Sequence, residues 1–387
     1  MSITEKKQII ELPLKFVFTE EGASDLMRQK VRFNRLTMGD KSEDYGVLLD
    51  KVTPAFLQRM VMADYISKIE VSGVEPVESR SDIIELSKLI VSGILYRNYA
   101  EVSLEQVLKA DPVKQWNHAN PSLVIDEKTQ FKEGLLQSFV DRHEDELRKM
   151  QDELVEPIYA RINNDETLLP DEIETHKELL QNFVGAVYPL TWFVLLKFRK
   201  TREFYLVIRD VRSSLSEFLK KSNIAEYASL LLMELASNIE NLNILREAKL
   251  LYGTSQVDMQ TVLQDPKLRL PVIESLRKKN NLLTFSWKLG GTSLAIGKRG
   301  RFQILLYDRD INYKETRESF EVTKAADVKR FNLSEFYQKL HGGGNDLELG
   351  MFYLSFVSEA CENMGIRFES MVTQFTAQTI TTLTFGI

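Results

Sequence analysis

The chain has 387 residues, of which 43% are hydrophobic and 27% charged, so it can bury a sizeable core and is long enough for two or three domains. Its net charge of −6, with no basic run or basic–aromatic stripe, excludes a dedicated nucleic-acid-binding protein. A single cysteine, Cys361, excludes an internal disulfide and a cysteine-rich metal site, and it fits the reducing cytoplasm in which we expect the protein.

The most apolar segment does not have the length of a membrane helix. It runs from Phe183 to Phe198, but Pro189 interrupts it and charged residues end it before the roughly 20 residues that a membrane helix requires. The N-terminal sequence "MSITEKKQII" also lacks the apolar stretch of a signal peptide. We therefore expect no membrane insertion, and we expect the apolar segment to be buried or packed against a partner protein.

Residues 1–125 are predicted to form a mixed region of strands and helices. The stretch "IELPLKFVF" alternates like a strand, and "VTPAFLQRMVMADYISKIEV" indicates a helix followed by a strand. Ser81 to Ala100 has a Ser/Asp start and helical apolar spacing. The stretch "ADPVKQWNHANPSLVIDE" is predicted to be a connection, because proline and asparagine recur in it. The sequence assigns this region no chemistry.

Residues 126–200 are predicted to be helical. A helix is expected from Leu135 to Leu154, ended by Pro157, with a second helix starting at Pro170 and Asp171. The first helix carries a row of mostly apolar residues at near-heptad spacing: Leu136, Val140, His143, Leu147, Met150 and Leu154. This row suits dimerisation or the binding of a partner helix, so a homodimer and a regulatory protein partner are both expected.

Residues 201–387 are predicted to combine a sheet with helices. We expect a strand at "EFYLVIRDV", a long helix from Ile224 to Leu250, and three strands at "LLTFSWKL", "TSLAIG" and "RFQILLYD". A helix at "MFYLSFVSEACENMG" and strands at "IRFES" and "TTLTFGI" complete the chain. The fold class is therefore α+β, with a helical N-terminal region followed by a sheet that helices cover on one face.

Four motifs follow one another in this second half. Glu234 and Asn238 lie one turn apart on the long helix, and Asp308 ends the strand "RFQILLYD". A glycine-containing segment, "HGGGNDLELG", precedes the next helix, and threonines alternate with apolar residues in "TITTLTFGI". Each motif alone is a weak signal, but their order is informative.

In this order the motifs resemble those of the histidine-kinase-like ATPase family, over roughly Glu203 to Ile387. The resemblance implies that residues 201–387 form a two-layer α/β sandwich, in which helices cover a mixed sheet. Residues 251–281 are then a helical insert. It also implies ATP and Mg²⁺ as ligands, and a cytoplasmic signalling or regulatory protein.

The resemblance implies a role for each motif. Asn238 would hold Mg²⁺ through the nucleotide, Glu234 would be a general base, and Asp308 would accept a hydrogen bond from the adenine amino group. The backbone of the glycine segment and one threonine of the last strand would contact the nucleotide. The nucleotide-binding residues implied in these two segments are Gly342, Gly343, Gly344, Gly350 and Thr382.

Three departures from the family pattern leave alternatives open. Asp310 and Asn312 replace the glycines that usually follow the adenine-binding aspartate, and Glu348 stands where a phosphate-facing glycine is usual. The added negative charge disfavours phosphates. The alternative to an ATPase or protein kinase is therefore a catalytically inactive scaffold that works through protein–protein contacts, and a third possibility is an unrelated α+β fold.

His143 is the candidate phosphoacceptor of a histidine kinase, because it lies on a predicted helix and Glu144 follows it. The alternative is an ordinary histidine on the packed side of that helix. The other histidines show no metal-ligand spacing.

Overall fold

The computed structural model describes residues 9–38, 41–126, 138–139, 141–166, 168–202, 204–253, 259–289, 300–308, 346–375 and 378–387. The chain divides into two compact units. Unit 1 combines Met1–Val91 with Ile224–Ile387, and unit 2 is the intervening segment Ser92–Asn223. These units differ from the segments 1–125, 126–200 and 201–387 expected from sequence, because one sheet draws strands from both ends of the chain.

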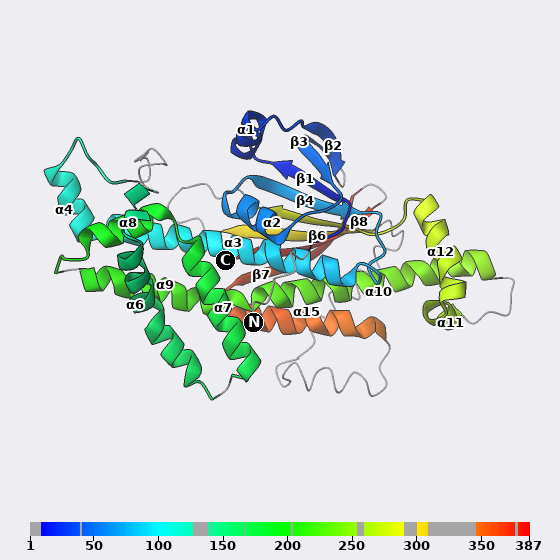
Figure 1. Ribbon diagram of the computed structural model, residues 1–387. Coiled ribbons are helices and arrows are strands. Elements are labelled where there is room, and N and C mark those ends of the chain that lie inside the picture. Colours follow the sequence, from blue (N-terminus) through cyan, green and yellow to red (C-terminus); the bar gives the residue numbers. More distant parts are fainter. Residues whose placement is uncertain are drawn as a thin grey trace, which may run out of the picture. The chain divides into compact units, whose positions relative to one another are not determined.

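Within the described residues, the sheet of unit 1 has eight strands in the order β2-β3-β1-β4-β5-β6-β8-β7 (Figure 1). Every neighbouring pair in it is antiparallel, so the expectation of a mixed sheet was wrong. Short hairpin connections such as β7–β8 favour this arrangement. The strands are β1 (Leu14–Phe18), β2 (Asn34–Met38), β3 (Lys41–Leu49), β4 (Ile66–Ser72), β5 (Thr284–Leu289), β6 (Arg301–Asp308), β7 (Arg367–Phe375) and β8 (Gln378–Gly386).

One face of the sheet forms the core of unit 1. Across the central strands, Ile69 pairs with Trp287, Trp287 with Ile304, and Ile304 with Leu383, and all four side chains are buried. Directly paired residues point to the same face of a sheet, so this row is continuous. The indole nitrogen of Trp287 donates a hydrogen bond of 3.2 Å to the hydroxyl of Ser87, which fixes the first part of α3 (Arg80–Lys109) over this face.

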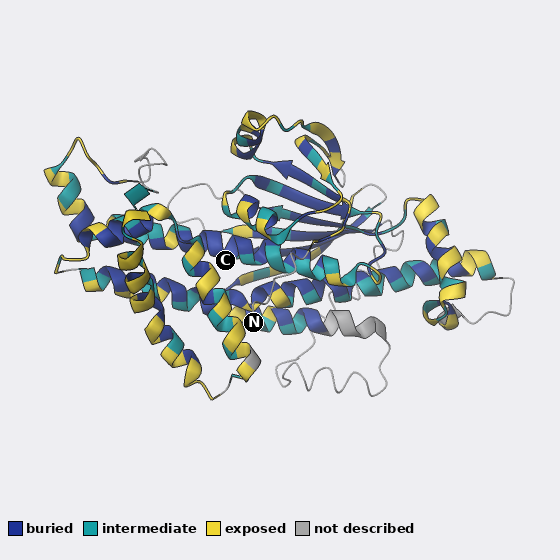
Figure 2. Cartoon of the chain, in the orientation of Figure 1, coloured by how far each residue is buried: buried dark blue, intermediate teal, exposed yellow. Residues whose placement is uncertain are grey.

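Two further long helices cover the same face of the sheet (Figure 1). The helix α10 (Ile224–Tyr252) contacts β6 and packs along α15 (Asp346–Asn363), which in turn contacts β7. Figure 2 shows α10 buried over much of its length. At its C-terminal end, α11 (Met259–Gln264) and α12 (Pro266–Lys278) pack on it through a small apolar core, so the described part of the segment expected as an insert is mostly helical.

Two short helices lie beside β1 to β4, and each begins with a threonine cap. In α1 (Glu20–Arg28), Thr19 accepts a hydrogen bond from the Gly22 amide, and in α2 (Pro54–Met62), Thr53 accepts one from the Phe56 amide. Such side-chain caps satisfy backbone donors that a helix start leaves open.

Unit 2 is a cluster of helices around aromatic side chains. Besides the second part of α3, it contains α4 (Asp111–Ala119), α6 (Glu144–Asn163), α7 (Pro170–Ala186), α8 (Pro189–Phe198) and α9 (Phe204–Ser222). Tyr96, Phe183 and Phe218 stack at its centre, with ring centroids of Phe183 and Phe218 4.8 Å apart. Burial raises the pKa of the Tyr96 hydroxyl to about 12.

Three predictions for the helical region were wrong. The described part of the predicted strand, "FYLVIRDV", belongs to α9, whose buried residues Val207, Val211, Leu215 and Phe218 follow helical spacing beyond the short window that suggested a strand. The expected connection after Ala110 contains α4, because Pro112 is tolerated in the first turn of a helix. Pro157 does not end α6, which continues to Asn163.

The end of the predicted apolar row, which lies in α6, and the apolar segment around Pro189 are used inside unit 2, whereas Leu136 and Val140 of that row lie outside the described residues. Met150 and Leu154 are buried, and α6 contacts α7, α8 and α9. Trp192, Leu195 and half of the other residues of α8 are buried as well. The "PLTWFVLL" stretch is therefore part of the interior and not an exposed surface for a partner. The predicted strand "TSLAIG" lies outside the described residues.

Over the described ranges, no single helix is both long and apolar enough to cross a membrane. One pair of helices, Glu172–Ala186 with Pro189–Phe198, meets the criteria of length and composition only when taken together, and it is bent by 84°.

Candidate functional site

The polar side chains of α10 occupy two different sides of that helix. Glu234 and Asn238 are one turn apart, as the sequence predicts, and both are partly buried. Asn243 follows five residues after Asn238, so at 100° per residue it projects about 140° away around the helix. The two sides therefore meet different neighbours.

Glu234 forms an ion pair with the first residue of α3. Its Oε1 atom lies 2.8 Å from Nη2 of Arg80, and Nη1 of Arg80 lies 3.4 Å from the hydroxyl of Ser237. A general base must be free to take up a proton from water or from a substrate hydroxyl. In this arrangement the carboxylate is held by a guanidinium through a charge-assisted hydrogen bond, which fixes its direction.

Asp308 lies at the end of β6 and is buried, and its partner comes from the other side of α10. The amide nitrogen of Asn243 donates a hydrogen bond of 2.8 Å to Oδ1 of Asp308. An amide NH₂ group presents the same kind of donor as the amino group of adenine. Asn243 therefore occupies one acceptor position of the carboxylate that was expected to bind the base.

The predicted nucleotide-binding threonine lies on the opposite face of the sheet from Asp308. Asp308 pairs with Thr379 and Leu305 pairs with Thr382 in the β6–β8 register. Side chains alternate between faces along a strand, so Thr379 and Thr381 share the face of Asp308 while Thr382 does not. Thr379 is buried, and it is the threonine that the register places nearest to Asp308.

The glycine segment can be placed only at its end. Gly342, Gly343 and Gly344, together with Asp310 and Asn312, lie outside the described residues. Gly350 lies within α15, which begins at Asp346, whereas the resemblance implied a loop up to this residue.

His143 is the residue immediately before α6 in unit 2. Its ring stacks on Phe139 with centroids 4.2 Å apart, and its Nδ1 atom lies 2.8 Å from the Phe139 carbonyl oxygen. These contacts fit an ordinary packed histidine. The candidate base and nucleotide ligands, by contrast, all belong to unit 1.

A second group of polar side chains, around Glu240 on α10, was not predicted from the sequence. Arg269 of α12 lies between two buried carboxylates, 2.8 Å from Oε1 of Glu75 and 3.2 Å from Oε2 of Glu240. Burial raises the pKa of Glu240 to about 7, and the charge of Glu75 adds to the increase while Arg269 opposes it. Glu240, Asn243 and Glu247 follow at helical spacing, and this was the signal available in the sequence.

Glu247 completes this side of α10. Its carboxylate accepts hydrogen bonds from Nζ of Lys279 at 2.6 Å and from the hydroxyl of Ser275 at 2.6 Å. These bonds outweigh desolvation and lower the pKa of Glu247. The row Glu240, Asn243 and Glu247 thus joins α10 to α12 and β6, which is a structural role.

Metal binding at this site would depend on a nucleotide. No group of three or more histidine, cysteine or acidic side chains suited to a metal ion occurs among the described residues. Asn238 is a single neutral ligand, so Mg²⁺ would need most of its oxygen ligands from phosphates and water.

Comparison with known proteins identifies the family. The model of a family of unknown function, DUF8084, matches residues 5–387. The chain belongs to this family. A DUF8084 assignment thus covers both units, including the strands from the two ends of the chain that form one sheet.

The chain is also similar to an uncharacterized protein of Treponema pallidum (strain Nichols), with 33% identity over 384 residues. The match covers 99% of this chain and 98% of that protein. No solved structure matches the chain.

Proposed function

We propose that the protein is a non-catalytic regulatory protein, which acts by binding another protein and uses a histidine-kinase-like framework as a scaffold. The observation that carries this proposal is the internal pairing of the two key carboxylates. Glu234 is bound by Arg80 and Asp308 by Asn243, so the expected base and the expected adenine acceptor both serve the fold. Thr382 lies on the face of the sheet opposite to Asp308, which supports the same conclusion.

The partner would contact surfaces that unit 2 exposes. Leu123, Leu169 and Tyr205 are each more than half exposed in that unit, although they are large and apolar. Exposed side chains of this kind are common in regions that bind other proteins. Met150 and Leu154 of the predicted apolar row are less suited to this role, since both are buried within their own unit.

A second candidate is an ATP-binding protein with magnesium-dependent hydrolysis or phosphoryl transfer. It is favoured by the contact of α10 with β6, which brings a helix carrying Glu234 and Asn238 next to a strand that ends in Asp308. In this candidate, nucleotide would replace Asn243 at Asp308.

Calorimetric titration with a non-hydrolysable ATP analogue and Mg²⁺ distinguishes the two candidates. We expect no detectable binding to the native chain at millimolar analogue. Binding that is lost in Asp308→Ala and in Asn238→Ala, but kept in the control Asn241→Ala on the same helix, would contradict the scaffold proposal and establish the second candidate.

Phosphoryl transfer is tested separately by incubation with labelled ATP. We expect no label on the native chain. Acid-labile label that disappears in His143→Gln would contradict the scaffold proposal and identify His143 as a phosphoacceptor.

A further inference from the structure

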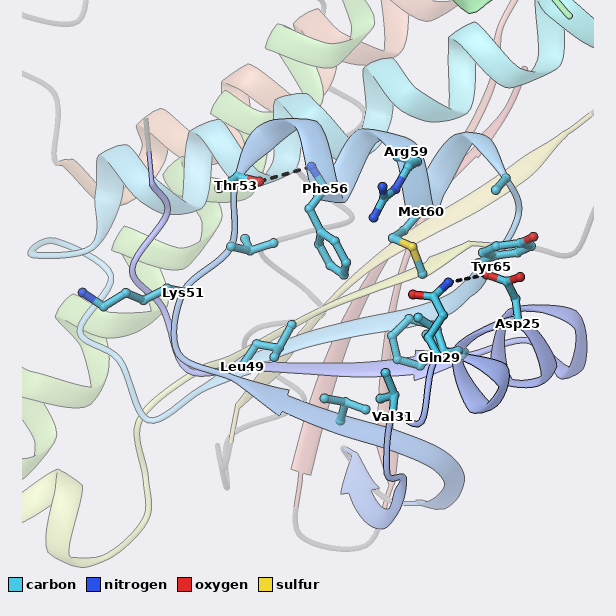
Figure 3. Close-up of a pocket in the computed structure, with 15 residues that line it drawn as sticks. Asp25, Gln29, Val31, Leu49, Lys51, Thr53, Phe56, Arg59, Met60 and Tyr65 are labelled. Carbon is cyan, nitrogen blue, oxygen red and sulfur yellow. Dashed lines mark hydrogen bonds between the residues drawn. The ribbon is translucent and has the colours of Figure 1, made fainter. Parts of the chain in front are cut away.

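An open cavity of about 760 Å³ lies in unit 1 between α1, α2 and the strands β1 and β3 (Figure 3). A volume of this size is typical of sites for small ligands, which occupy roughly 300 to 1,000 Å³. It lies apart from the α10 residues considered above, since none of them lines it. Its apolar lining residues are Phe18, Leu26, Val31, Val47, Leu49, Val52, Phe56, Met60, Ala63 and Tyr65.

The sequence of α2 directs one side of that helix into the cavity. Phe56, Arg59, Met60 and Ala63 all line the cavity, and their spacing of three, one and three residues places them on one face. In Figure 3 the side chains of Phe56, Arg59 and Met60 extend from α2 toward the strands. The cavity is therefore bounded on this side by a regular helical face.

Helix ends fix the other parts of the wall. Lys30 has φ of 64° after α1, and Asp64 has φ of 55° after α2. Each is followed by a residue whose amide bonds back into its helix, Val31 to the carbonyl of Leu26 and Tyr65 to that of Met60. Because Val31 and Tyr65 line the cavity, these two helix ends hold the wall in place.

The charged side chains around the cavity differ in whether they have partners. Lys51 is 2.6 Å from Glu11 and points away from the cavity, and Asp25 accepts a hydrogen bond of 3.0 Å from Gln29 (Figure 3). Arg59 lies over the Phe56 ring at 5.8 Å, and no carboxylate among the described residues pairs with it. The cavity thus combines an apolar wall with one guanidinium whose hydrogen-bond donors are available.

We propose that this cavity binds a small carboxylate with an apolar chain, the chain lying against Leu49, Phe56 and Met60 and the carboxylate pairing with Arg59. A guanidinium donates two parallel hydrogen bonds to a carboxylate, which selects this group over a neutral hydroxyl. The aliphatic part gains free energy with each buried methylene. This binding site is independent of the scaffold role and of ATP.

Calorimetry with octanoate, octan-1-ol and butyrate tests each part of the proposal. We expect octanoate to bind more tightly than butyrate by on the order of a hundredfold, because four more methylenes are buried. Octanoate should also bind about tenfold more tightly than octan-1-ol, which has the same chain without the charge.

Variants of the full chain assign the binding to this cavity. Arg59→Met should weaken the binding of octanoate by about tenfold and leave the binding of octan-1-ol unchanged. The control Arg28→Met removes an exposed arginine outside the cavity, and it should leave the affinity for both ligands unchanged. Because Arg59 is exposed, its replacement leaves the core intact, and circular dichroism checks this. The proposal is wrong if the native chain does not bind octanoate at millimolar concentration, or if Arg59→Met and Arg28→Met behave alike.

Discussion

Glu240 is a buried carboxylate, 3% exposed, that shares one arginine with a second buried carboxylate. Its pKa is raised to about 7 from an ordinary value of 4.5. Between these pH values the folded chain holds a proton that the unfolded chain has lost. Stability therefore falls as pH rises from about 4.5 to about 7.

Replacement of Glu240 by glutamine should remove this dependence on pH. The native chain is expected to lose about 2 to 3 kcal/mol of unfolding free energy between pH 5 and pH 8 through this group, since each pKa unit corresponds to about 1.4 kcal/mol. Urea denaturation at both pH values measures the difference. Glu226→Gln, an exposed position on the same helix, is the control and should keep the native dependence on pH. An equal loss of unfolding free energy between pH 5 and pH 8 in the native chain and in Glu240→Gln would contradict the prediction.

Cys361 should not react in the folded chain. It is fully buried on α15, and burial raises the pKa of its thiol to about 12, so little thiolate exists at pH 8. A thiol reagent such as Ellman's reagent is expected to modify one group in guanidinium chloride and almost none in buffer. Complete modification of the native chain within minutes would show that α15 is not packed as described.

Residue types and spacing predicted the site less well than they predicted helices. The pair Glu234 and Asn238 is on one helix face, as expected, but no local pattern indicates that Arg80, 154 positions away, binds Glu234. The face of Thr382 depends on the β6–β8 register, and a shift of one residue would exchange it with Thr381. Long-range pairing of this kind is invisible to local patterns.

At the scale of an element, Gly22 permits α1 to lie close to the start of β4. A Cβ atom at Gly22 would be 2.4 Å from the Tyr65 carbonyl oxygen and 2.7 Å from the Tyr65 Cα atom, both of them backbone atoms that cannot turn aside. Thr19 holds the same approach through hydrogen bonds of 2.9 Å to the carbonyls of Asp64 and Tyr65.

Gly22→Ala should therefore destabilise the protein, by about 1 to 3 kcal/mol, as overpacking does. The matched control is Gly185→Ala in α7, where a Cβ atom would meet no other atom within 4 Å. That change should stabilise its helix by about 0.5 to 1 kcal/mol. Chemical denaturation of both variants gives the two values, and the same sign for both would contradict the assignment of Gly22 as a contact glycine.

Elements with long, regular patterns were predicted well from sequence, and elements with short patterns were not. The helix α10 and the strands β4, β5 and β6 agree with expectation within a few residues, because their apolar periodicity extends over most of their length. The helix α3 was expected from Ser81 to Ala100, and it starts as predicted but continues to Lys109. In α9 the first residues, "FYLVI", suit either a strand or a helix. The helical spacing becomes evident only when Val211, Leu215 and Phe218 are included. Pro157 was misleading because tertiary packing of α6 outweighs the lost hydrogen bond.

At the scale of the whole molecule, one sheet depends on both ends of the chain. Of the eight strands that the structure describes, residues 201–387 supply four, and β5 pairs on one side with β4 from the first part of the chain. The resemblance to a single C-terminal domain did not reveal this, because composition does not change at the point where the strands are shared.

The fragment 201–387 should therefore not fold on its own. Without β4, the backbone of β5 has no partner along one edge, and Phe285 and Trp287 lose their neighbours Val71 and Ile69. We expect aggregation or a broad, non-cooperative thermal transition by circular dichroism and size-exclusion chromatography, with the full chain as control. A monodisperse fragment with a cooperative transition would support the domain boundary suggested by sequence.

The β4–β5 pairing has a consequence for synthesis on the ribosome. Ser72 and Thr284 are paired neighbours in the sheet but lie 212 positions apart, 284 minus 72. At translation rates of about 5 to 20 residues per second, β4 waits on the order of 10 to 40 seconds before its partner exists. During that interval its hydrogen-bonding edge is open to any other strand in the cell, so the nascent chain is most vulnerable to misassembly before β5 emerges.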